Sequence, residues 1–330
     1  MERPIKKPNE AFVTLAANDL YGKGSLVLGC SLRKHKTTRQ LVVLITPQVS
    51  QTVRTVLGRI FDEVLLVDVL KSQDSSKLIL KKTPELSLML AKLYCWDLTR
   101  YSKCVFMDAD TMALMNIDEL FEWEELSAVA DDICSDCFNT GVFVFKPSTD
   151  THKALLKFAM EKGSFDNGNQ GLLNSFFSNW AKVDISKHLP FTYNLNCNSV
   201  HFSTLKPQAA AAKVIHFLGK TKPWNYSYDP NTKLVKDHDL SVTHPEYVYM
   251  WWDNFTSSVL PMLTEHGVEE ATSSTKEEKI TEALTRLSII PPTVTASSEE
   301  RRQRWEQGQV DFMGADSFQN IQKKLDAYLN

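Results

Sequence analysis

The sequence predicts an α/β fold built on a mainly parallel sheet, because short apolar strands alternate with longer segments of helical spacing. Strands rich in apolar and β-branched residues are expected at 12–15, 41–46, 63–69, 104–107, 141–145 and 214–217. Helices are expected at 23–35, 53–61 and 86–99, where apolar residues recur with helical spacing. Strands that are apolar on both faces are typical of a parallel sheet covered by helices on both sides. Such sheets bind ligands outside the carboxyl ends of their strands, so functional residues are expected there.

Composition limits the classes of function. A chain of 330 residues can hold one large catalytic domain with an appendage, or two modest domains. The formal net charge of −3 argues against a general nucleic-acid binder, which needs a basic face. The longest apolar runs, such as 41–45, are strand-sized and far below the ~20 residues of a membrane span. The polar N-terminus has no apolar signal segment, so a cytoplasmic location is expected.

The cysteines are scattered over the chain, at Cys30, Cys95, Cys104, Cys134, Cys137 and Cys197. Cys134 and Cys137 have C-x-x-C spacing, but no second pair completes a zinc site. We therefore expect reduced thiols, as in a cytosolic protein, rather than a metal or redox centre.

Shifts in composition divide the chain into a disordered N-terminal extension, a main domain, a linker and a tail, at 1–10, 11–265, 266–296 and 297–330. The main domain is expected to end in an aromatic-rich helix at 245–263. The linker is rich in Thr, Ser and Glu. The tail is expected to contain a short amphipathic helix with one apolar face, made of Phe318, Ile321, Leu325 and Leu329. Such a helix either packs back on the domain or lies in a partner's groove, and the pattern favours a partner.

The most informative segment is 104–110, in which largely apolar residues lead into Asp108, Ala109 and Asp110. Side chains at i and i+2 of a strand point to the same side, so both carboxylates can address one divalent cation. A cation with open positions neutralises charge on a departing nucleoside diphosphate. Two solvated loop aspartates are the simpler alternative, and the motif alone is weak.

A histidine in a later strand strengthens the metal hypothesis. His216 lies in an apolar strand that runs into Gly219. Such a histidine is more often a hydrogen-bonded core residue, yet an imidazole beside two carboxylates suits Mn²⁺. Lys220, Lys222 and Trp224 follow at once, and lysine is a common phosphate partner.

A polar, glycine-containing loop precedes an expected helix at 172–180. Its sequence, Asp-Asn-Gly-Asn-Gln-Gly over 166–171, can present side chains and backbone N–H groups to a sugar. A plain helix cap is equally consistent with this pattern.

With these motifs the chain resembles the glycogenin family of retaining, DxD-containing glycosyltransferases. The resemblance runs over 11–263, through FVTLAAND, YSKCVFMDADT, DCFNTGVFVF, GSFDNGNQGLLNSFF and KVIHFLGKTKPWNY. It resumes in the tail, which is similar to a segment that binds glycogen synthase. It implies a Rossmann-like, single-domain fold of the GT-A type, usually as a homodimer, with UDP-glucose as donor and a glucan chain as product.

The resemblance also implies a role for particular residues. Mn²⁺ is expected on Asp108, Asp110 and His216. Donor contacts are implied for Leu15, Asn18 and Tyr21 at the uridine, for Asn139, Thr140, Asp166 and Gln170 at the glucose, and for Gly219 and Lys222 at the diphosphate. Ala109 is also implied in donor binding. Catalytic roles are implied for Lys92, Asp166 and Asn169. Asp166 would orient the sugar or act as a nucleophile.

Four positions depart from the family pattern. The acceptor tyrosine would fall near His201, and no tyrosine occurs between 193 and 226. Asn169 stands where the family has an aspartate, and an amide cannot act as a base. Thr83 replaces an arginine that contacts the nucleotide, and Ala17 replaces a hydroxyl residue.

Three functions follow as hypotheses. The first is an active glucosyltransferase that forms an α-1,4-glucan primer with retention and is impaired in self-glucosylation. Its acceptor would be an existing glucan, another subunit's tyrosine, or one of Tyr226, Tyr228 and Tyr328. The alternative is a catalytically weak or inactive paralogue that acts as a scaffold and recruits glycogen synthase through 297–330. A related transferase for another small acceptor is the third. Intact donor-site residues favour the first.

Overall fold

The computed structural model describes residues 9–68, 84–134, 136–162, 169–182, 185–197, 212–219, 221–229, 232, 234–236 and 244–267. The chain divides into two units, Met1–Ser274 and Thr275–Asn330, and the described residues all lie in the first. The expected tail, most of the linker and most of the N-terminal extension fall outside them. The expected division of the chain therefore stays a prediction.

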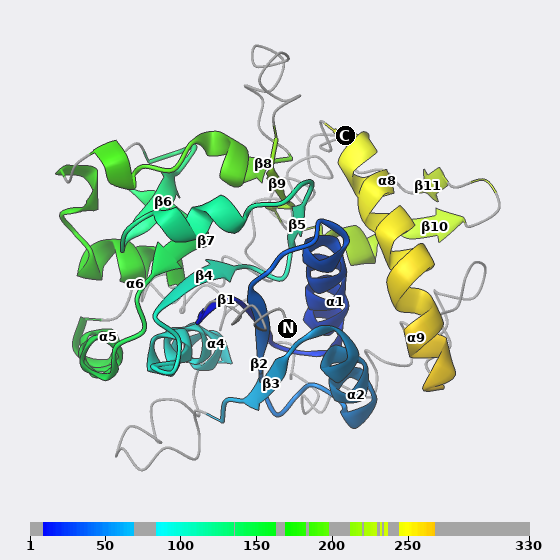
Figure 1. The fold of residues 1–330 in the computed structure, drawn as a ribbon, viewed down its shortest axis with the longest axis horizontal. Helices are drawn as coiled ribbons and strands as arrows, with labels where there is room; N and C mark the ends of the chain where they lie inside the picture. Colours follow the sequence, from blue (N-terminus) through cyan, green and yellow to red (C-terminus); the bar gives the residue numbers. More distant parts are fainter. Residues whose placement is uncertain are drawn as a thin grey trace, which may run out of the picture. The chain divides into compact units, whose positions relative to one another are not determined.

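A six-stranded sheet forms the centre of the described unit, in the order β3-β2-β1-β4-β7-β6 (Figure 1). Its strands are β1 (Glu10–Ala16), β2 (Gln40–Ile45), β3 (Glu63–Leu66), β4 (Lys103–Met107), β6 (Ser127–Ala130) and β7 (Phe138–Phe145). The first four in spatial order pair in parallel, whereas β7 is antiparallel to both β4 and β6. The predicted α/β fold with a mainly parallel sheet is confirmed.

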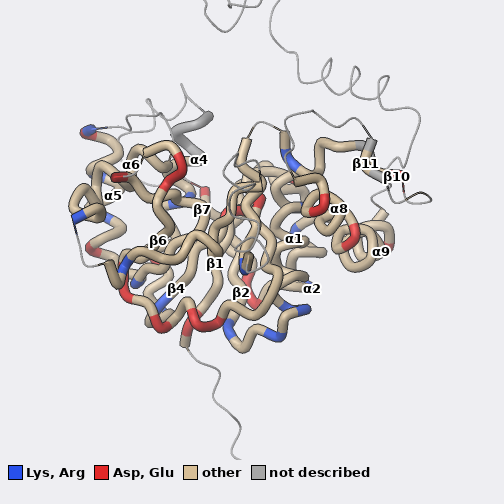
Figure 2. Tube along the Cα trace, turned by 90° about the horizontal axis from the view of Figure 1, so that it is seen from above, with Lys and Arg blue, Asp and Glu red and all other residues tan. Residues whose placement is uncertain are grey.

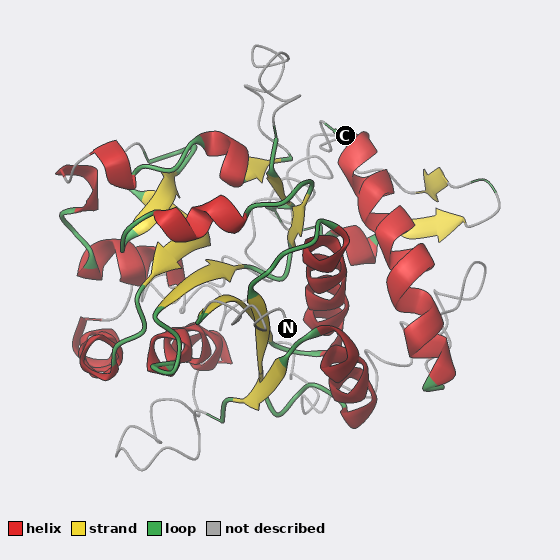
Figure 3. Cartoon of the chain, viewed as in Figure 1, coloured by secondary structure: helices red, strands yellow, loops and turns green. Residues whose placement is uncertain are grey.

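Helices cover both faces of this sheet (Figure 3). One side carries α1 (Asp19–Lys34) and α2 (Gln51–Ile60), and the other carries α4 (Pro84–Leu93), α5 (Thr149–Lys162) and α6 (Asn169–Phe176). Successive strand residues enter different cores because strand side chains alternate: Phe12 lies in the core under α1, and Val13 lies in the core on the opposite face. This explains why β1 carries apolar residues on both of its faces.

An aromatic helical segment packs beside α1 and α2 (Figure 1). It comprises α8 (Pro245–Asn254), a π-helical stretch η9 (Phe255–Val259) and α9 (Leu260–Glu265). The expected helix at 245–263 corresponds to this segment. Short 3-10 turns occur at η2 (Tyr94–Asp97), η3 (Asp118–Glu122), η4 (Trp180–Lys182), η5 (Ile185–Lys187), η6 (Phe191–Tyr193) and η8 (Pro223–Asn225).

A second, three-stranded sheet differs from the expectation for 214–217. That segment is β9 (Val214–His216), and it lies between β5 (Thr111–Ala113) and β8 (Leu195–Asn196) rather than in the main sheet. The pairing with β5 is antiparallel and sets His216 opposite Thr111, one residue after Asp110. A small hairpin, β10 (Ser227–Asp229) with β11 (Leu234–Lys236), follows.

The expectation of reduced thiols throughout is wrong at one pair. Cys134 and Cys137 form a disulfide, with their Cα atoms 5.2 Å apart. The turn between them, in which the N–H of Cys137 donates to the carbonyl oxygen of Cys134 at 2.9 Å, brings the two side chains within reach. The other four cysteines are free and buried, and burial raises the pKa of Cys30 to about 11.

Acidic and basic residues are interspersed along the described elements (Figure 2). Many pair locally, as Arg39 does with Glu10 at 2.7 Å and Arg33 with Asp62 at 2.7 Å. Within the described ranges, each helix is too short or too polar to cross a membrane.

Candidate active site

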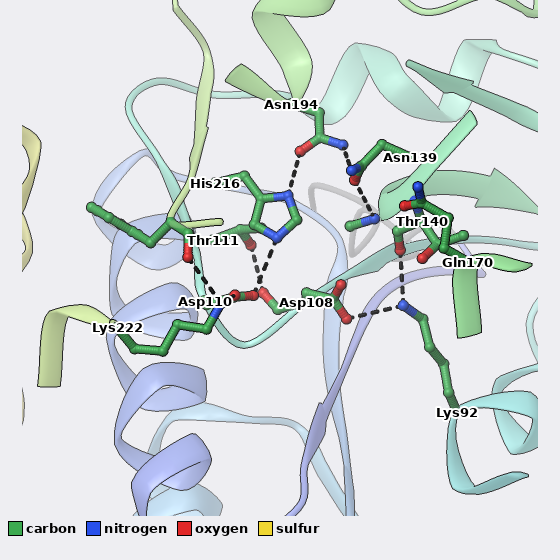
Figure 4. A network of polar contacts seen from close by, with 12 residues as sticks. Lys92, Asp108, Asp110, Thr111, Asn139, Thr140, Gln170, Asn194, His216 and Lys222 are labelled. Carbon is green, nitrogen blue, oxygen red and sulfur yellow. Dashed lines mark hydrogen bonds and ion pairs between the residues drawn. The ribbon is translucent and has the colours of Figure 1, made fainter. Parts of the chain in front are cut away.

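Two aspartates and a histidine converge at the carboxyl end of β4 (Figure 4). The chain turns directly after Met107: the N–H of Asp108 donates to the carbonyl oxygen of Gly141 at 2.8 Å, and the N–H of Thr111 donates to the carbonyl oxygen of Asp108 at 3.0 Å. One ligand atom from each of Asp108, Asp110 and His216 lies within 4.8 Å of the other two. The structure thus brings together the three residues that the sequence proposes as metal ligands.

The second sheet explains why His216 reaches this point. The N–H of Phe217 donates to the carbonyl oxygen of Asp110 at 2.9 Å, which ties the end of β9 to the turn. The imidazole Nε2 then lies 3.4 Å from Asp110 Oδ1. Two carboxylates and one imidazole form a donor set that suits a divalent cation such as Mn²⁺. The residues present therefore fit a metal.

Each aspartate also contacts a lysine. Lys222 Nζ lies 2.5 Å from Asp110 Oδ2 and donates to the carbonyl oxygen of Phe217 at 3.0 Å. Burial raises the pKa of Asp110, but His216 and Lys222 outweigh burial and bring it below its usual value. Asp110 is therefore a carboxylate at neutral pH and a competent ligand.

Lys92 holds Asp108 from the opposite side. It lies in the last turn of α4, is only 2% exposed, and donates to Asp108 Oδ1 at 3.0 Å and to the carbonyl oxygen of Thr140 at 2.8 Å. Its ammonium group also lies 4.4 Å from the centre of the Phe106 ring. A buried cation with these partners fixes the orientation of Asp108 and joins it to β7.

Three of the four residues expected to face glucose, Asn139, Thr140 and Gln170, gather around Asp131, which the sequence analysis did not single out. Asp131 follows β6, and its Oδ2 accepts from Asn139 Nδ2 at 3.2 Å and from Gln170 Nε2 at 2.9 Å. The N–H of Thr140 donates to Gln170 Oε1 at 3.4 Å. Burial raises the pKa of Asp131, but the hydrogen bonds that it accepts lower the pKa by more than burial raises it. The carboxyl group is therefore ionised at neutral pH. Like Asp108, Asp131 stands directly after a strand, and this position is the sequence feature that could have indicated a functional residue.

Asn194 is a second residue that sequence reasoning missed. Its Oδ1 lies 2.8 Å from His216 Nδ1, and its Nδ2 donates to Asn139 Oδ1 at 2.8 Å (Figure 4). Asn194 thus connects His216 of the metal group, which comprises Asp108, Asp110 and His216, with the sugar-facing group, which comprises Asp131, Asn139 and Gln170. It follows a 3-10 turn rather than a recognisable motif, so the sequence carried no signal for it.

The residues expected at the uridine lie where β1 passes into α1. Asn18 caps α1, because its Oδ1 accepts from the backbone N–H groups of Leu20 at 3.0 Å and Tyr21 at 3.2 Å. The Tyr21 ring meets Trp224 edge-on at 5.2 Å. Burial raises the pKa of Tyr21, and the charge of Lys222 acts against that rise. Tyr21 therefore lies within electrostatic reach of the metal group. Leu15 is half-buried in β1.

Two glycines are required by their surroundings near this site. A Cβ on Gly24 would lie 2.5 Å from the carbonyl oxygen of Ala109, so only glycine lets α1 approach the Asp108–Asp110 turn this closely. Gly219 has a φ of 111°, which side chains other than glycine rarely adopt.

The sugar-side loop is only partly described. Asp166, Thr83 and His201 lie outside the described residues. Asn169 is the first residue of α6, and its Oδ1 is buried without a hydrogen-bond partner among the described residues. Ala17 is buried, and its carbonyl oxygen accepts from Thr46 Oγ1 at 2.6 Å.

The comparisons with known proteins agree on one family. The model of glycosyl transferase family 8 matches residues 12–227. Glycogenin-1 of Mus musculus is 56% identical, over 97% of this chain and 99% of the relative. Glycogenin-2 of Homo sapiens is 52% identical, over 81% of this chain and 54% of the relative.

The solved structures give the same fold. The apo-form glycosyltransferase GlyE of Streptococcus pneumoniae covers 78% of this chain and matches over 62% of its own, with a TM-score of 0.52 at 18% identity. The bifunctional glycosyltransferase WbbM covers 80% of this chain and matches over 53% of its own, with a TM-score of 0.52 at 16% identity. At this level of identity the likeness shows the fold alone.

Proposed function

The chain belongs to glycosyl transferase family 8 and, within it, to the glycogenins, and on this premise we propose that it transfers glucose from UDP-glucose, with retention of the α configuration, to build an α-1,4-glucan primer. The observation that carries the proposal is the convergence of Asp108, Asp110 and His216 at the carboxyl end of β4. Nucleotide ligands of α/β sheets bind at such an edge.

The metal group and Lys222 form the diphosphate end of the proposed site. Asp108, Asp110 and His216 would hold Mn²⁺, which when bound neutralises the charge of a departing diphosphate. Lys222 brings a second positive charge to the same place, because its Nζ contacts Asp110 directly. Lys92 keeps Asp108 oriented and is itself too buried to meet the donor.

Carboxylate and amide groups on the other side suit the hydroxyl groups of glucose. Asp131, Asn139 and Gln170 offer hydrogen-bond donors and acceptors within one network. Asp166 would complete this side, either by orienting the sugar or by acting as a nucleophile. Asn169 lacks the negative charge that would favour a developing oxocarbenium ion, and we therefore expect slow turnover.

The accessibility of the tyrosines bears on the acceptor. Tyr226 is only 4% exposed, and the ring of Tyr228 stacks on Trp252 at 5.1 Å. Tyr226 is therefore withdrawn from solvent, and stacking restricts the ring of Tyr228. We therefore propose that the acceptor is an existing glucan end or a tyrosine beyond the described residues, such as Tyr328.

The location, the oligomeric state and the protein partner that we propose follow from membership of the glycogenins. We expect a cytoplasmic protein that acts as a homodimer and binds glycogen synthase through residues 297–330. A short tail with aromatic and apolar anchors is suited to docking in a groove.

Incorporation of labelled glucose tests the function. Wild-type protein and an Asp108→Ala variant are incubated with labelled UDP-glucose and Mn²⁺, with and without a malto-oligosaccharide, and peptide mapping locates any label on protein. Label on the oligosaccharide from the wild type alone supports the proposal. Equal labelling in the two proteins, or none in either, refutes it.

A scaffolding role is the second candidate, and Asn169 and His201 favour it, since loss of a loop carboxylate and of the acceptor phenol would follow relaxed selection on catalysis. It predicts capture of glycogen synthase by a protein that transfers no glucose. Capture and transfer measured on the same preparation separate the two functions.

A further inference from the structure

A single chain of hydrogen bonds runs from the sugar side of the site to the metal side. Asp131 accepts from Asn139, Asn139 accepts from Asn194, and the oxygen of Asn194 faces His216; Figure 4 shows the part of this chain from Asn139 to His216. Asn139, Asn194 and His216 are each at most 7% exposed. Water therefore does not compete for these contacts, and the direction of each hydrogen bond has to be consistent with the next.

Two fixed groups decide the direction of the chain. The backbone N–H of Gly141 can only donate, and it donates to Asn139 Oδ1 at 2.9 Å. The ionised carboxylate of Asp131 can only accept, and it faces Asn139 Nδ2 at 3.2 Å. Both ends assign the same orientation to the amide of Asn139. The group of Asn194 that faces Asn139 Oδ1 must therefore be its NH₂, at 2.8 Å.

This orientation leaves the carbonyl oxygen of Asn194 pointing at the imidazole. Oδ1 of Asn194 lies 2.8 Å from His216 Nδ1, and an amide oxygen can only accept. His216 Nδ1 must therefore carry a hydrogen. The other ring nitrogen, Nε2, is the one that faces Asp110, at 3.4 Å.

We propose that Asn194 is a positioning residue, which holds His216 as the Nδ1–H tautomer so that the lone pair of Nε2 is directed at the metal. The inference rests on the proposed function in one respect, that the metal group binds a divalent cation. An outer partner that fixes the tautomer of a histidine ligand commonly changes metal affinity by about 10–100-fold.

Three variants separate positioning from plain packing. Asn194→Leu removes both hydrogen bonds at nearly constant volume. Asn194→Asp keeps an acceptor for His216 Nδ1–H but loses the donor to Asn139. Asn254→Leu is the matched control, because Asn254 is also buried, at 8% exposure, and its amide is also hydrogen-bonded, to the carbonyl oxygen of Met250 at 2.9 Å.

Mn²⁺ affinity is the first readout, measured without UDP-glucose from the paramagnetic resonance signal of free Mn²⁺. We expect Asn194→Leu to weaken binding by about 10–100-fold, and Asn194→Asp to stay within about 3-fold of the wild type. Asn254→Leu is expected to bind Mn²⁺ as the wild type does. Wild-type affinity in Asn194→Leu, equal weakening in Asn254→Leu, or equal weakening in Asn194→Asp would each overturn the inference.

The tautomer itself is the second readout. Long-range ¹H–¹⁵N spectra of metal-free, histidine-labelled protein report which ring nitrogen carries hydrogen, and the His216 signals are assigned by their loss in a His216→Gln variant. The spectra are recorded at a pH at which the ring carries a single hydrogen, because an imidazolium carries one on both nitrogens. That hydrogen on Nδ1 supports the inference, and that hydrogen on Nε2 overturns it. A wild type that binds no Mn²⁺ would contradict the proposed function, and this spectrum then decides the inference separately.

Discussion

Replacing Gly141 with alanine tests how closely the imidazole of His216 packs on β7. A Cβ at this position would lie 2.1 Å from His216 Cε1, 2.4 Å from Nδ1 and 3.0 Å from Asn139 Oδ1. An ordinary contact begins near 3.4 Å, so the ring or the strand must move by about 1.3 Å. His216 cannot retreat easily, because β5 and β8 pair with it on both sides.

The size of this displacement sets the expected effects. Ligand distances in a metal site tolerate about 0.2 Å, so a shift of about 1.3 Å removes the imidazole as a ligand. A misplacement of about 1 Å in a catalytic group can cost ~10²-fold in rate, and overpacking a core costs about 1–3 kcal/mol of stability. We therefore expect Gly141→Ala to remain folded but to lose about 10²-fold in kcat.

The assay compares Gly141→Ala with Gly58→Ala in Mn²⁺-dependent transfer and in thermal unfolding. Gly58 lies in α2, and a Cβ there would meet nothing within 4 Å. Alanine is favoured over glycine inside a helix by about 1 kcal/mol, so the control should unfold at the same or a higher temperature and keep full activity. If Gly141→Ala kept wild-type Mn²⁺ affinity and a rate within about 2-fold, the packing argument would be wrong.

Three further predictions concern the charge, the loop and the tail. Lys222→Gln removes the ammonium group that contacts Asp110, and kcat should fall by about 10²–10³-fold in a folded protein; an unchanged kcat would exclude Lys222 from the diphosphate end. Asn169→Asp should raise transfer by up to about 10²-fold, and adding His201→Tyr should raise self-glucosylation in the labelling assay. No increase in either would mean that these two positions do not limit turnover. Trp305→Ala should abolish capture of glycogen synthase in a pull-down, since aromatic anchors commonly contribute ~2 kcal/mol or more, and unchanged capture would remove the tail from that role.

The elements of the main sheet could be predicted because their signal is local. The expected strands at 12–15, 41–46 and 104–107 correspond to β1, β2 and β4, each within two residues at either end. An apolar run reports that its residues are buried, and that information does not depend on the partner. The order of the strands, and the antiparallel direction of β7, do depend on the partner and came only from the structure.

The sequence by itself determined the pair of carboxylates, because Asp108 and Asp110 stand two residues apart at the end of a buried strand. Tertiary structure decided that β9 pairs with β5, which sets His216 beside that pair, and that Asp131 and Asn194 join the site from other elements. The separation of two residues along one strand is fixed by backbone geometry. The contacts of His216 with Asn194 and with Asp110, which are 22 and 106 positions away along the chain, are instead fixed by how whole elements pack, and no local pattern records that.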